Sequence, residues 1–335
     1  MRSSPGLSPR AVGLAASVIT VTIWTSFIVI ARASAQRTLG PFDIALLRIL
    51  GAGLILVPWG WWMLRTRGLP GWLGVSPLPW RQTALTGLFG GLLYAMLAYS
   101  GFFYAPAAHA SVLMPGSLPL WTTLLAAMIL GERITPARAA GLALIVAGDL
   151  LVGGASLLQA FSGGDVWRGD LLFMSAAFCW SVYSVLARKH GLGAVEATIA
   201  VTVFAAVFYL PGYALSAASG FLQSRLALAP WTEILFQLVF QGIGSVVISG
   251  ITFTLMIRHF GPVRSTMITA LVPGLSALGA VVFLGEPLQW NLLAGLALVT
   301  AGILFGVRAV ACAAAPSEFA TKSIAPHAAN SRAGG

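Results

Sequence analysis

The chain has 335 residues, of which 58% are hydrophobic and only 8% are charged. Soluble domains carry roughly a quarter of charged residues, so this composition excludes a soluble fold with a water-facing surface. The net charge of +10 is best explained by basic loops that orient a membrane protein, and we expect no nucleic-acid partner.

Membrane-spanning helices are the first elements that the hydropathy pattern predicts. A bilayer core of about 30 Å requires about 20 helical residues. Apolar runs of about this length, separated by short loops with Gly, Pro and charged residues, occur over 12–31, 42–64, 83–104, 107–130, 137–153, 170–187, 195–217, 234–257, 263–284 and 288–307. The chain is therefore predicted to be an all-α integral membrane protein with ten transmembrane helices.

The chain also contains an internal repeat. Residues 108–151 and 262–305 align without a gap at a constant offset of 154. The identical pieces include Leu130-Gly131-Glu132 with Leu284-Gly285-Glu286, and Ala147-Gly148 with Ala301-Gly302. Farther upstream, Trp24 to Arg32 resembles Trp180 to Arg188 at an offset of 156. Five spans is an odd number, so the second repeat must enter the bilayer inverted, and inverted repeats are typical of transporters with a site near the midplane.

Basic residues predict the orientation. Fourteen of the 19 Lys and Arg residues fall on one set of alternate loops and four on the other, which places both termini in the cytoplasm of a bacterial inner membrane. The predicted organisation comprises a cytoplasmic N-terminus (1–11), a first five-helix repeat (12–153), an outer linker (154–169), a second five-helix repeat (170–308) and a disordered cytoplasmic tail (309–335).

The repeated motifs resemble a known family. Gly131-Glu132 followed by Gly141 and Ala147-Gly148 recurs as Gly285-Glu286-Pro287 followed by Gly295 and Ala301-Gly302, and Trp24 and Leu47-Arg48 stand in the first two spans. This pattern resembles the EamA family of the drug/metabolite transporter superfamily. The resemblance implies a carrier of two inverted five-helix EamA-type repeats, commonly an exporter of amino acids, other metabolites or drugs. The family includes aromatic amino-acid exporters similar to YddG.

The sequence also bears on how transport is powered. No GxxxxGK[ST] motif occurs, so we expect transport down a gradient or coupled to an ion or proton. Asp149 and Asp170 are predicted near the outer ends of their spans, facing the headgroups, and Glu132 and Glu286 are expected to cap or pack loops. Proton coupling usually needs an ionisable group inside the membrane, so a facilitator or exchanger is favoured.

No cofactor and no metal are expected. Cys179 and Cys312 are the two cysteines, and neither they nor the four histidines show a metal-ligand spacing. The expected partners are a small-molecule substrate and the lipid bilayer, and a coupling ion or proton is left open. A monomer and a homodimer both remain open.

Arg48 is the charged residue that stands out, because it lies about two turns inside the second span. An arginine at a helix centre costs about 2.5–3.5 kcal/mol to insert. One interpretation is a cation that lines the outer half of a cavity and meets a carboxylate; the alternatives are snorkelling to the outer headgroups or a structural partner. His109, at the outer start of the fourth span, is either an interfacial donor or a part of this site.

Polar and aromatic residues predict the cavity wall. The eighth span carries Gln237, Gln241, Ser245, Ser249 and Thr252 on one helical face, and helix packing is the alternative explanation for this stripe. The third span offers two tyrosines. Two repeat-related tryptophans, Trp24 and Trp180, lie mid-span, where they either line the pocket or pack in the core. The predicted substrate-binding residues are Arg48, Trp24, Tyr94, Tyr99, His109, Trp180, Gln241, Ser245 and Ser249.

Prolines predict the moving parts. Pro115, Pro119 and Pro273 interrupt the fourth and ninth spans at corresponding places, and proline frees a backbone carbonyl and kinks a helix. Pro119 and Pro273 are therefore the predicted hinges for alternating access.

These features predict a secondary transporter that exports a small metabolite, an amino acid or a similar amphipathic solute. Efflux of drugs or flipping of lipid-like solutes is the alternative within transport. A membrane-embedded enzyme is disfavoured, because such enzymes need clustered Asp, His or metal ligands.

Overall fold

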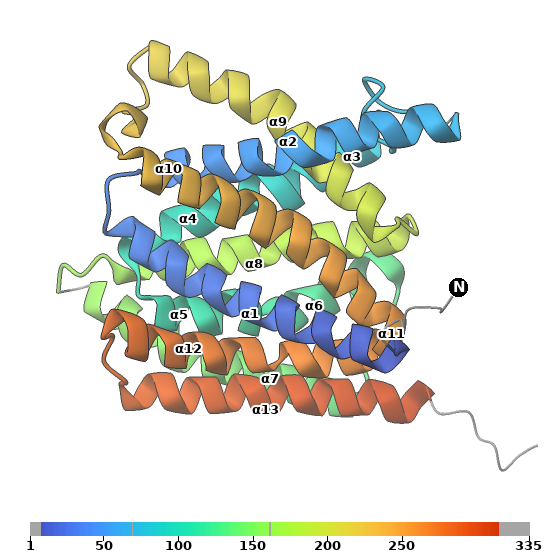
Figure 1. The fold of residues 1–335 in the computed structure, drawn as a ribbon. Helices are drawn as coiled ribbons and strands as arrows, with labels where there is room; N and C mark the ends of the chain where they lie inside the picture. The colour runs from blue at the N-terminus through green and yellow to red at the C-terminus, as the bar shows by residue number, and fades with distance from the viewer. Residues whose placement is uncertain (1–7, 69, 161, 315–335) are drawn as a thin grey trace, which may run out of the picture.

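Long helices that run side by side make up the bundle (Figure 1). The computed structural model describes residues 8–68, 70–160 and 162–314. Within these ranges, nine helices are long and apolar enough to cross a membrane, and Trp290–Gly306 is a shorter apolar helix. The predicted all-α membrane fold is confirmed.

Several spans are built from more than one helical segment. In chain order the segments are α1 (Pro9–Ala35), α2 (Pro41–Arg67), α3 (Trp80–Gly87), η1 (Leu88–Leu93), α4 (Tyr94–Tyr104), α5 (Ala107–Ser111), η2 (Val112–Gly116), α6 (Leu118–Leu130), α7 (Pro136–Ala160), α8 (Val166–Lys189), α9 (Ala194–Ala218), η3 (Leu226–Leu228), α10 (Trp231–Gln237), η4 (Leu238–Ile248), α11 (Ser249–Thr269), α12 (Leu271–Leu284) and α13 (Trp290–Ala314). The segments η1, η2 and η4 are π-helical and η3 is a 3₁₀ turn. The third, fourth and eighth predicted spans each contain one of the π-helical segments.

The helices run past the predicted ends of the spans. Most of the predicted linker over 154–169 is helical, because α7 continues to Ala160 and α8 begins at Val166. The predicted disordered tail is helical up to Ala314, while residues 315–335 lie outside the described residues. A hydropathy window marks only the part of a helix inside the hydrocarbon, and backbone hydrogen bonding carries the helix on into the headgroup region.

Repeated glycines show how the two halves meet. A Cβ atom on Gly148 would lie 2.6 Å from the carbonyl oxygen of Gly295, and one on Gly141 would lie 2.7 Å from that of Gly302. The repeat offset relates Gly141 to Gly295 and Gly148 to Gly302, so the contacts are crossed. Crossed contacts are what two antiparallel helices related by a two-fold axis make, and small residues allow their backbones to approach this closely. The α7–α13 pair therefore confirms that the second repeat is inverted.

The repeated Gly-Glu motif ends one helix in each repeat. Gly131 and Gly285 follow α6 and α12 with φ values of 71° and 67°, a left-handed conformation that glycine adopts without a Cβ clash. The next amides close the turns, from Glu132 to Ala126 and from Glu286 to Ala280. Because the repeats are inverted, the two glutamates emerge at opposite ends of the bundle.

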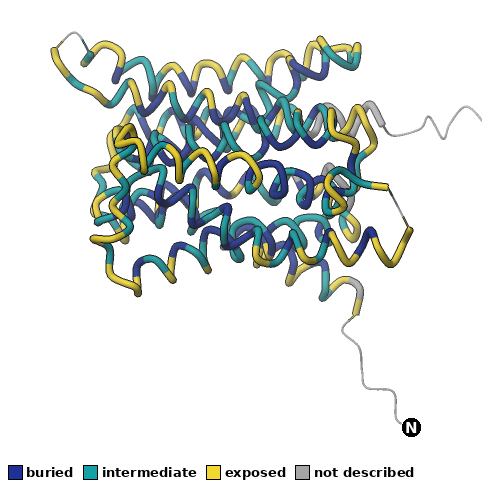
Figure 2. Tube along the Cα trace, turned by 90° about the horizontal axis from the view of Figure 1, so that it is seen from above, coloured by how far each residue is buried: buried dark blue, intermediate teal, exposed yellow. Residues whose placement is uncertain are grey.

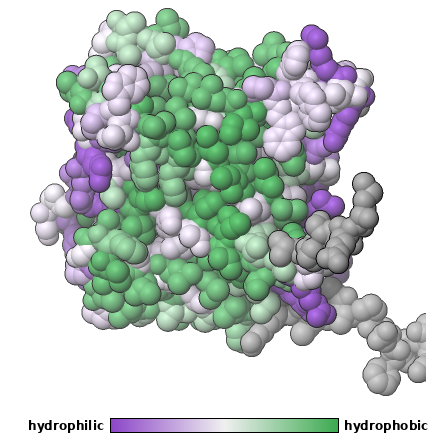
Figure 3. Space-filling view, in the orientation of Figure 1, coloured by the Kyte–Doolittle hydropathy of each residue, from purple (hydrophilic) through white to green (hydrophobic). Residues whose placement is uncertain are grey.

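The outer surface is apolar around the middle of the bundle. In Figure 3 hydrophobic residues cover the central face, and hydrophilic residues gather at its two edges. Large apolar side chains point outward, such as Met128 at 81% exposure and Phe283 at 78%, and buried residues gather in the interior (Figure 2). We call the end where α1 begins and α13 finishes the termini side, and the end where α1 finishes and α2 begins the far side.

Gly148→Val tests the α7–α13 contact. The added side chain would meet the backbone of α13, which cannot move aside as a flexible side chain can, and overpacking of this kind costs about 1–3 kcal/mol. We expect a lower melting temperature of the purified protein in detergent. Gly154→Val, on the same helix with no atom within 4 Å of an added Cβ, is the matched control. Equal melting temperatures for both variants would contradict the proposed packing.

Candidate substrate cavity

A cavity of about 710 Å³ lies inside the bundle. Pockets that hold small molecules typically measure about 300–1,000 Å³. Both repeats contribute to its wall, and Gly191 and Leu192 bring the wall to the loop between α8 and α9 on the termini side. The described lining includes no residue from the far-side loops at 36–40, 105–106 or 162–165. The cavity therefore reaches the termini side and is closed toward the far side.

Arg48 of α2 lies in the cavity wall, and η4 holds it there. Its Nη1 donates to Ser245 Oγ at 2.7 Å, to the Gln241 carbonyl oxygen at 3.4 Å and to the Tyr99 hydroxyl at 3.5 Å. Tyr99 in turn donates to Gln241 Oε1 at 3.0 Å. The guanidinium carbon also lies 5.5 Å from the ring centroid of Phe27, within the range of a cation–π contact. Arg48 is thus oriented by neutral groups.

A close helix crossing brings these groups together. A Cβ atom on Gly51, about one turn after Arg48, would lie 2.2 Å from the Leu238 carbonyl oxygen, and one on Gly242 would lie 2.6 Å from Gly51 Cα. Only glycine permits backbones to approach to this distance. The crossing places the guanidinium next to Gln241 and Ser245.

The charge of the cavity is entirely positive in its described part. Arg48 and Arg188 line the wall, and none of the lining residues is Asp or Glu. Among the described residues, no carboxylate forms an ion pair with Arg48. An unpaired cation in a low-dielectric wall attracts an anionic ligand.

Aromatic rings form the apolar part of the wall. Trp24 of α1 packs on Phe253 of α11 with ring centroids 5.0 Å apart. Trp180 of α8 packs on Tyr94 at 4.8 Å and on Tyr183 at 5.2 Å. The two tryptophans are related by the repeat, and each meets an aromatic partner from the other repeat. Such rings present flat apolar surface for a ligand.

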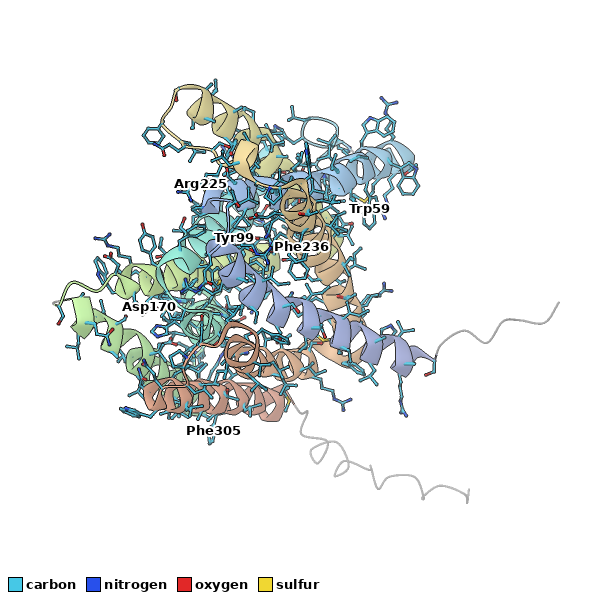
Figure 4. All side chains as sticks on the ribbon, turned by 60° about the vertical axis from the view of Figure 1, so that its left-hand side comes forward. Trp59, Tyr99, Asp170, Arg225, Phe236 and Phe305 are labelled. Atoms are coloured by element: carbon cyan, nitrogen blue, oxygen red, sulfur yellow. The ribbon has the colours of Figure 1, made fainter. Side chains whose placement is uncertain are left out.

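Six of the nine predicted binding residues lie in the wall: Trp24, Arg48, Tyr94, Trp180, Ser245 and Ser249. Tyr99 and Gln241 lie behind Arg48, buried to 1% and 0% exposure, and Figure 4 shows Tyr99 in the interior of the bundle. They orient the guanidinium and are not part of the described wall.

The polar stripe of the eighth span is divided among several neighbours. Gln237 donates to Ser34 of α1 at 2.6 Å, and the hydroxyls of Thr252 and Thr20 lie 2.8 Å apart. Between them the π-helical η4 alters the turn, because its hydrogen bonds run from i to i+5. Only Ser245 and Ser249 of this stripe reach the cavity, so the prediction of one polar cavity face was wrong for the others.

His109 does not meet Arg48 and is not in the described wall. Its Nδ1 lies 2.9 Å from Asp170 Oδ1, and Ser156 donates to the other oxygen of that carboxylate. Asp170 is buried to 5% exposure and Asp149, in the middle of α7, to 7%. The predicted headgroup location of both carboxylates was wrong, because α7 and α8 continue beyond the predicted span ends and other helices cover the two side chains.

Two repeat-related ion pairs lie at opposite ends of the bundle. Arg32 Nε lies 3.6 Å from Glu286 on the far side, with side-chain exposures of 20% and 12%. Glu286 also accepts from the amides of Ala107 and Ala108 at 2.9 and 3.0 Å. Arg188 pairs with Glu132 on the termini side, with exposures of 48% and 36%. The pair on the closed side is the more buried. Glu286 caps the start of α5, in keeping with the expected capping role, and both ion pairs in addition join the two repeats.

The helix interruptions beside the prolines also correspond. Ser117 separates η2 from α6, and Ala270 separates α11 from α12. Pro119 and Pro273 follow these interruptions, and Pro115 lies inside η2. Pro115, Leu118 and Val272 are part of the cavity wall, so a change of angle at either interruption would reshape the cavity.

Phe27 and Phe253 belong to the wall but were not predicted. Phe27 follows Trp24 by three residues, as Tyr183 follows Trp180, and the offset of 156 relates the two positions. The repeat alignment therefore contained the signal for Phe27. Nothing comparable marks Phe253, whose role depends on packing against Trp24.

Comparisons with known proteins agree with this architecture. Residues 11–154 and 167–308 each match the sequence model of the EamA-like transporter family. An uncharacterized transporter of Archaeoglobus fulgidus is 31% identical over 198 residues, which are 58% of this chain and 64% of that protein. A probable terminal-alkyne amino-acid exporter of Streptantibioticus cattleyicolor is 28% identical over 300 residues, or 86% of this chain and 91% of that protein.

A solved crystal structure has a similar fold. It superposes with a TM-score of 0.56 at 25% identity and covers 87% of this chain and 97% of its own. The two family matches, one in each repeat, account for most of the sequence and describe a transporter rather than an enzyme. The chain belongs to the EamA-like transporter family.

Proposed function

We propose that this transporter exports a small amphipathic carboxylate, an amino acid or a similar solute, by alternating access. The observation that carries the proposal is the Arg48 guanidinium in the wall of the cavity, with no carboxylate paired to it in the described part of the chain. Among the described residues, neutral groups hold it through a single nitrogen, Nη1. The rest of the planar fork suits a carboxylate, which arginine binds with two parallel hydrogen bonds.

The apolar part of the solute would lie on the aromatic walls. Trp24 and Phe253 on one side, and Tyr94, Trp180 and Tyr183 on the other, present flat ring surfaces to the cavity. The ammonium group of an amino acid could rest on a ring face by a cation–π contact. A cationic drug is disfavoured, because the wall holds Arg48 with no acidic partner among the described residues. The relative named as an amino-acid exporter supports this class of solute.

The two repeat-related ion pairs support alternating access. The Arg32–Glu286 pair joins the repeats on the far side, which is closed, and the Arg188–Glu132 pair would become buried when the termini side closes. Inverted repeats can exchange two such conformations around a central site. The interruptions at Ser117 and Ala270, with Pro119 and Pro273 beside them, are the hinges in this proposal.

The orientation follows from the basic loops. Fourteen of the 19 Lys and Arg residues fall on the set of alternate loops that the sequence assigns to the side of the termini, and we infer this to be the cytoplasmic side of a bacterial inner membrane. The cavity then faces the cytoplasm and is ready to receive a solute for export.

Arg48→Met tests the carboxylate site. Truncating one partner of a buried charge pair costs about 2 kcal/mol or more, so we expect counterflow of carboxylate solutes in proteoliposomes to fall by about 30-fold. The measurement is uptake of labelled amino acid into vesicles preloaded with a panel of amino acids, their methyl esters and cationic drugs. Arg168→Gln, at an exposed arginine, is the control. Equal stimulation by esters and free acids would contradict the proposal.

Glu286→Gln and Glu132→Gln test the two closures. Breaking a buried ion pair costs several kcal/mol and an exposed one much less, so the first change should shift the conformational equilibrium strongly toward the far-side-open state. The second should shift it in the opposite direction, because the Arg188–Glu132 pair becomes buried in the state whose termini side is closed. The measurement is modification of Ser249→Cys by an impermeant thiol reagent from either side, with Cys179 and Cys312 replaced by serine. Shifts in the same direction for both variants would contradict the proposed exchange.

A further inference from the structure

Asp149 is a buried carboxyl group that substrate binding does not use. It lies in the middle of α7, is exposed to 7%, and is not part of the described cavity wall. Ser117 donates to its Oδ2 at 2.8 Å, and its Oδ1 is buried with no hydrogen-bond partner among the described residues. No described ion pair includes it. Ionisable groups inside membrane bundles are expensive, and they commonly mark proton or ion pathways.

Ser117, the described donor to Asp149, lies at one of the proposed hinges. Ser117 occupies the interruption between η2 and α6, with φ −81° and ψ −10°. Met114, Pro115 and Leu118, on either side of Ser117, line the cavity. A negative charge at Asp149 would need more donors or water than Ser117 provides. A change in the charge of Asp149 therefore changes its bond to Ser117, which lies at the interruption beside the cavity.

A row of small and polar residues leads from Asp149 toward the far side. Gly153 and Ser156 follow Asp149 at one and two helical turns on α7. A Cβ on Gly153 would lie 4.0 Å from Asp170 Oδ2, and Ser156 donates to the same oxygen. His109, with 15% of its side chain exposed, bonds Asp170 and ends the row.

The surroundings of Asp149 contain few other charges. On α8, Asp170 is the acidic residue that faces α7 at the row, and Cys179 is a buried thiol on the same helix. On α5, His109 is the titratable group. The described side chains of η2, α6 and the part of α13 packed on α7 include no charged residue. His109 and Asp170 are thus the described titratable groups between Asp149 and the far side.

We propose that Asp149 is the proton-binding site that couples solute export to proton entry. A proton from the far side reaches the carboxylate through His109 and Asp170 and converts it to the neutral acid. In the other half of the cycle the acid releases this proton on the termini side and becomes a carboxylate again. One proton thus enters for each solute exported. This inference rests on the proposed transport function and adds the coupling ion, replacing the facilitator that the sequence favoured.

Asp149→Asn separates coupling from exchange, because asparagine keeps an acceptor for Ser117 and cannot change its charge. We expect the variant to retain solute counterflow within about twofold, and to lose about 10-fold or more of the proton entry that export evokes. Proton entry is read from a pH-sensitive dye trapped on the termini side of the membrane. Asp165→Asn, at an exposed carboxylate, is the control and should keep both activities. Full proton entry in Asp149→Asn would overturn the inference. An equal loss of proton entry in Asp149→Asn and in the control Asp165→Asn would also overturn it.

A spectroscopic measurement makes the test independent of any solute. The purified wild-type protein should show the infrared carbonyl stretch of a protonated carboxylic acid at neutral pH. This band should vanish in Asp149→Asn and shift in Ser117→Ala, which removes the donor. Absence of the band in the wild-type protein overturns the inference. Absence of counterflow for the whole solute panel, with the band present, overturns the proposed function and leaves Asp149 as a proton site.

Discussion

The charge of Arg48 is the constraint on which the architecture of the site depends, because the bilayer interior cannot solvate it. The protein meets this constraint with dipoles rather than with a counter-ion. The Gly51–Gly242 crossing brings η4 against α2, so that Ser245, the Gln241 carbonyl and Tyr99 all lie on one side of the guanidinium. Since these partners are neutral, the positive charge remains available to an anion in the cavity.

The repeats share the framework and differ in the chemistry. Trp24/Trp180, Arg32/Arg188, the Gly-Glu turns and the crossed glycines occur twice, and each pair builds a contact between the repeats. The polar residues of the site occur once: the offset of 154 relates Asp149 to Ile303, and α9, the counterpart of α2, contains no arginine or lysine. In the proposed mechanism, duplication supplies two conformations of one scaffold, and the single-copy residues supply the solute and proton sites within it.

The sequence predicted the inverted fold because the repeated motifs contain residues that contact the other half. Such residues occur in both copies and are therefore visible when the two halves are aligned. It also located Arg48, since a charge inside an apolar run is costly wherever its partners lie. The depth of Asp149 and Asp170 was missed, because hydropathy marks hydrocarbon and not the end of α7 or the start of α8. The division of the stripe through Gln237, Gln241 and Ser245 was missed because η4 is π-helical, and no propensity in that segment distinguishes i→i+5 from i→i+4 bonding.

Near-symmetry also explains how one proton could drive the cycle. Each closure joins the repeats through the same residue types, Arg32 with Glu286 on one side and Arg188 with Glu132 on the other. When one pair becomes exposed and the other becomes buried, most of the energy terms cancel. Reversing a population from 1:99 to 99:1 takes about 5.5 kcal/mol. The effective penalty of burying one ion is several kcal/mol, so gain or loss of the charge at Asp149, beside the Ser117 interruption, is of the size needed to choose between the two states.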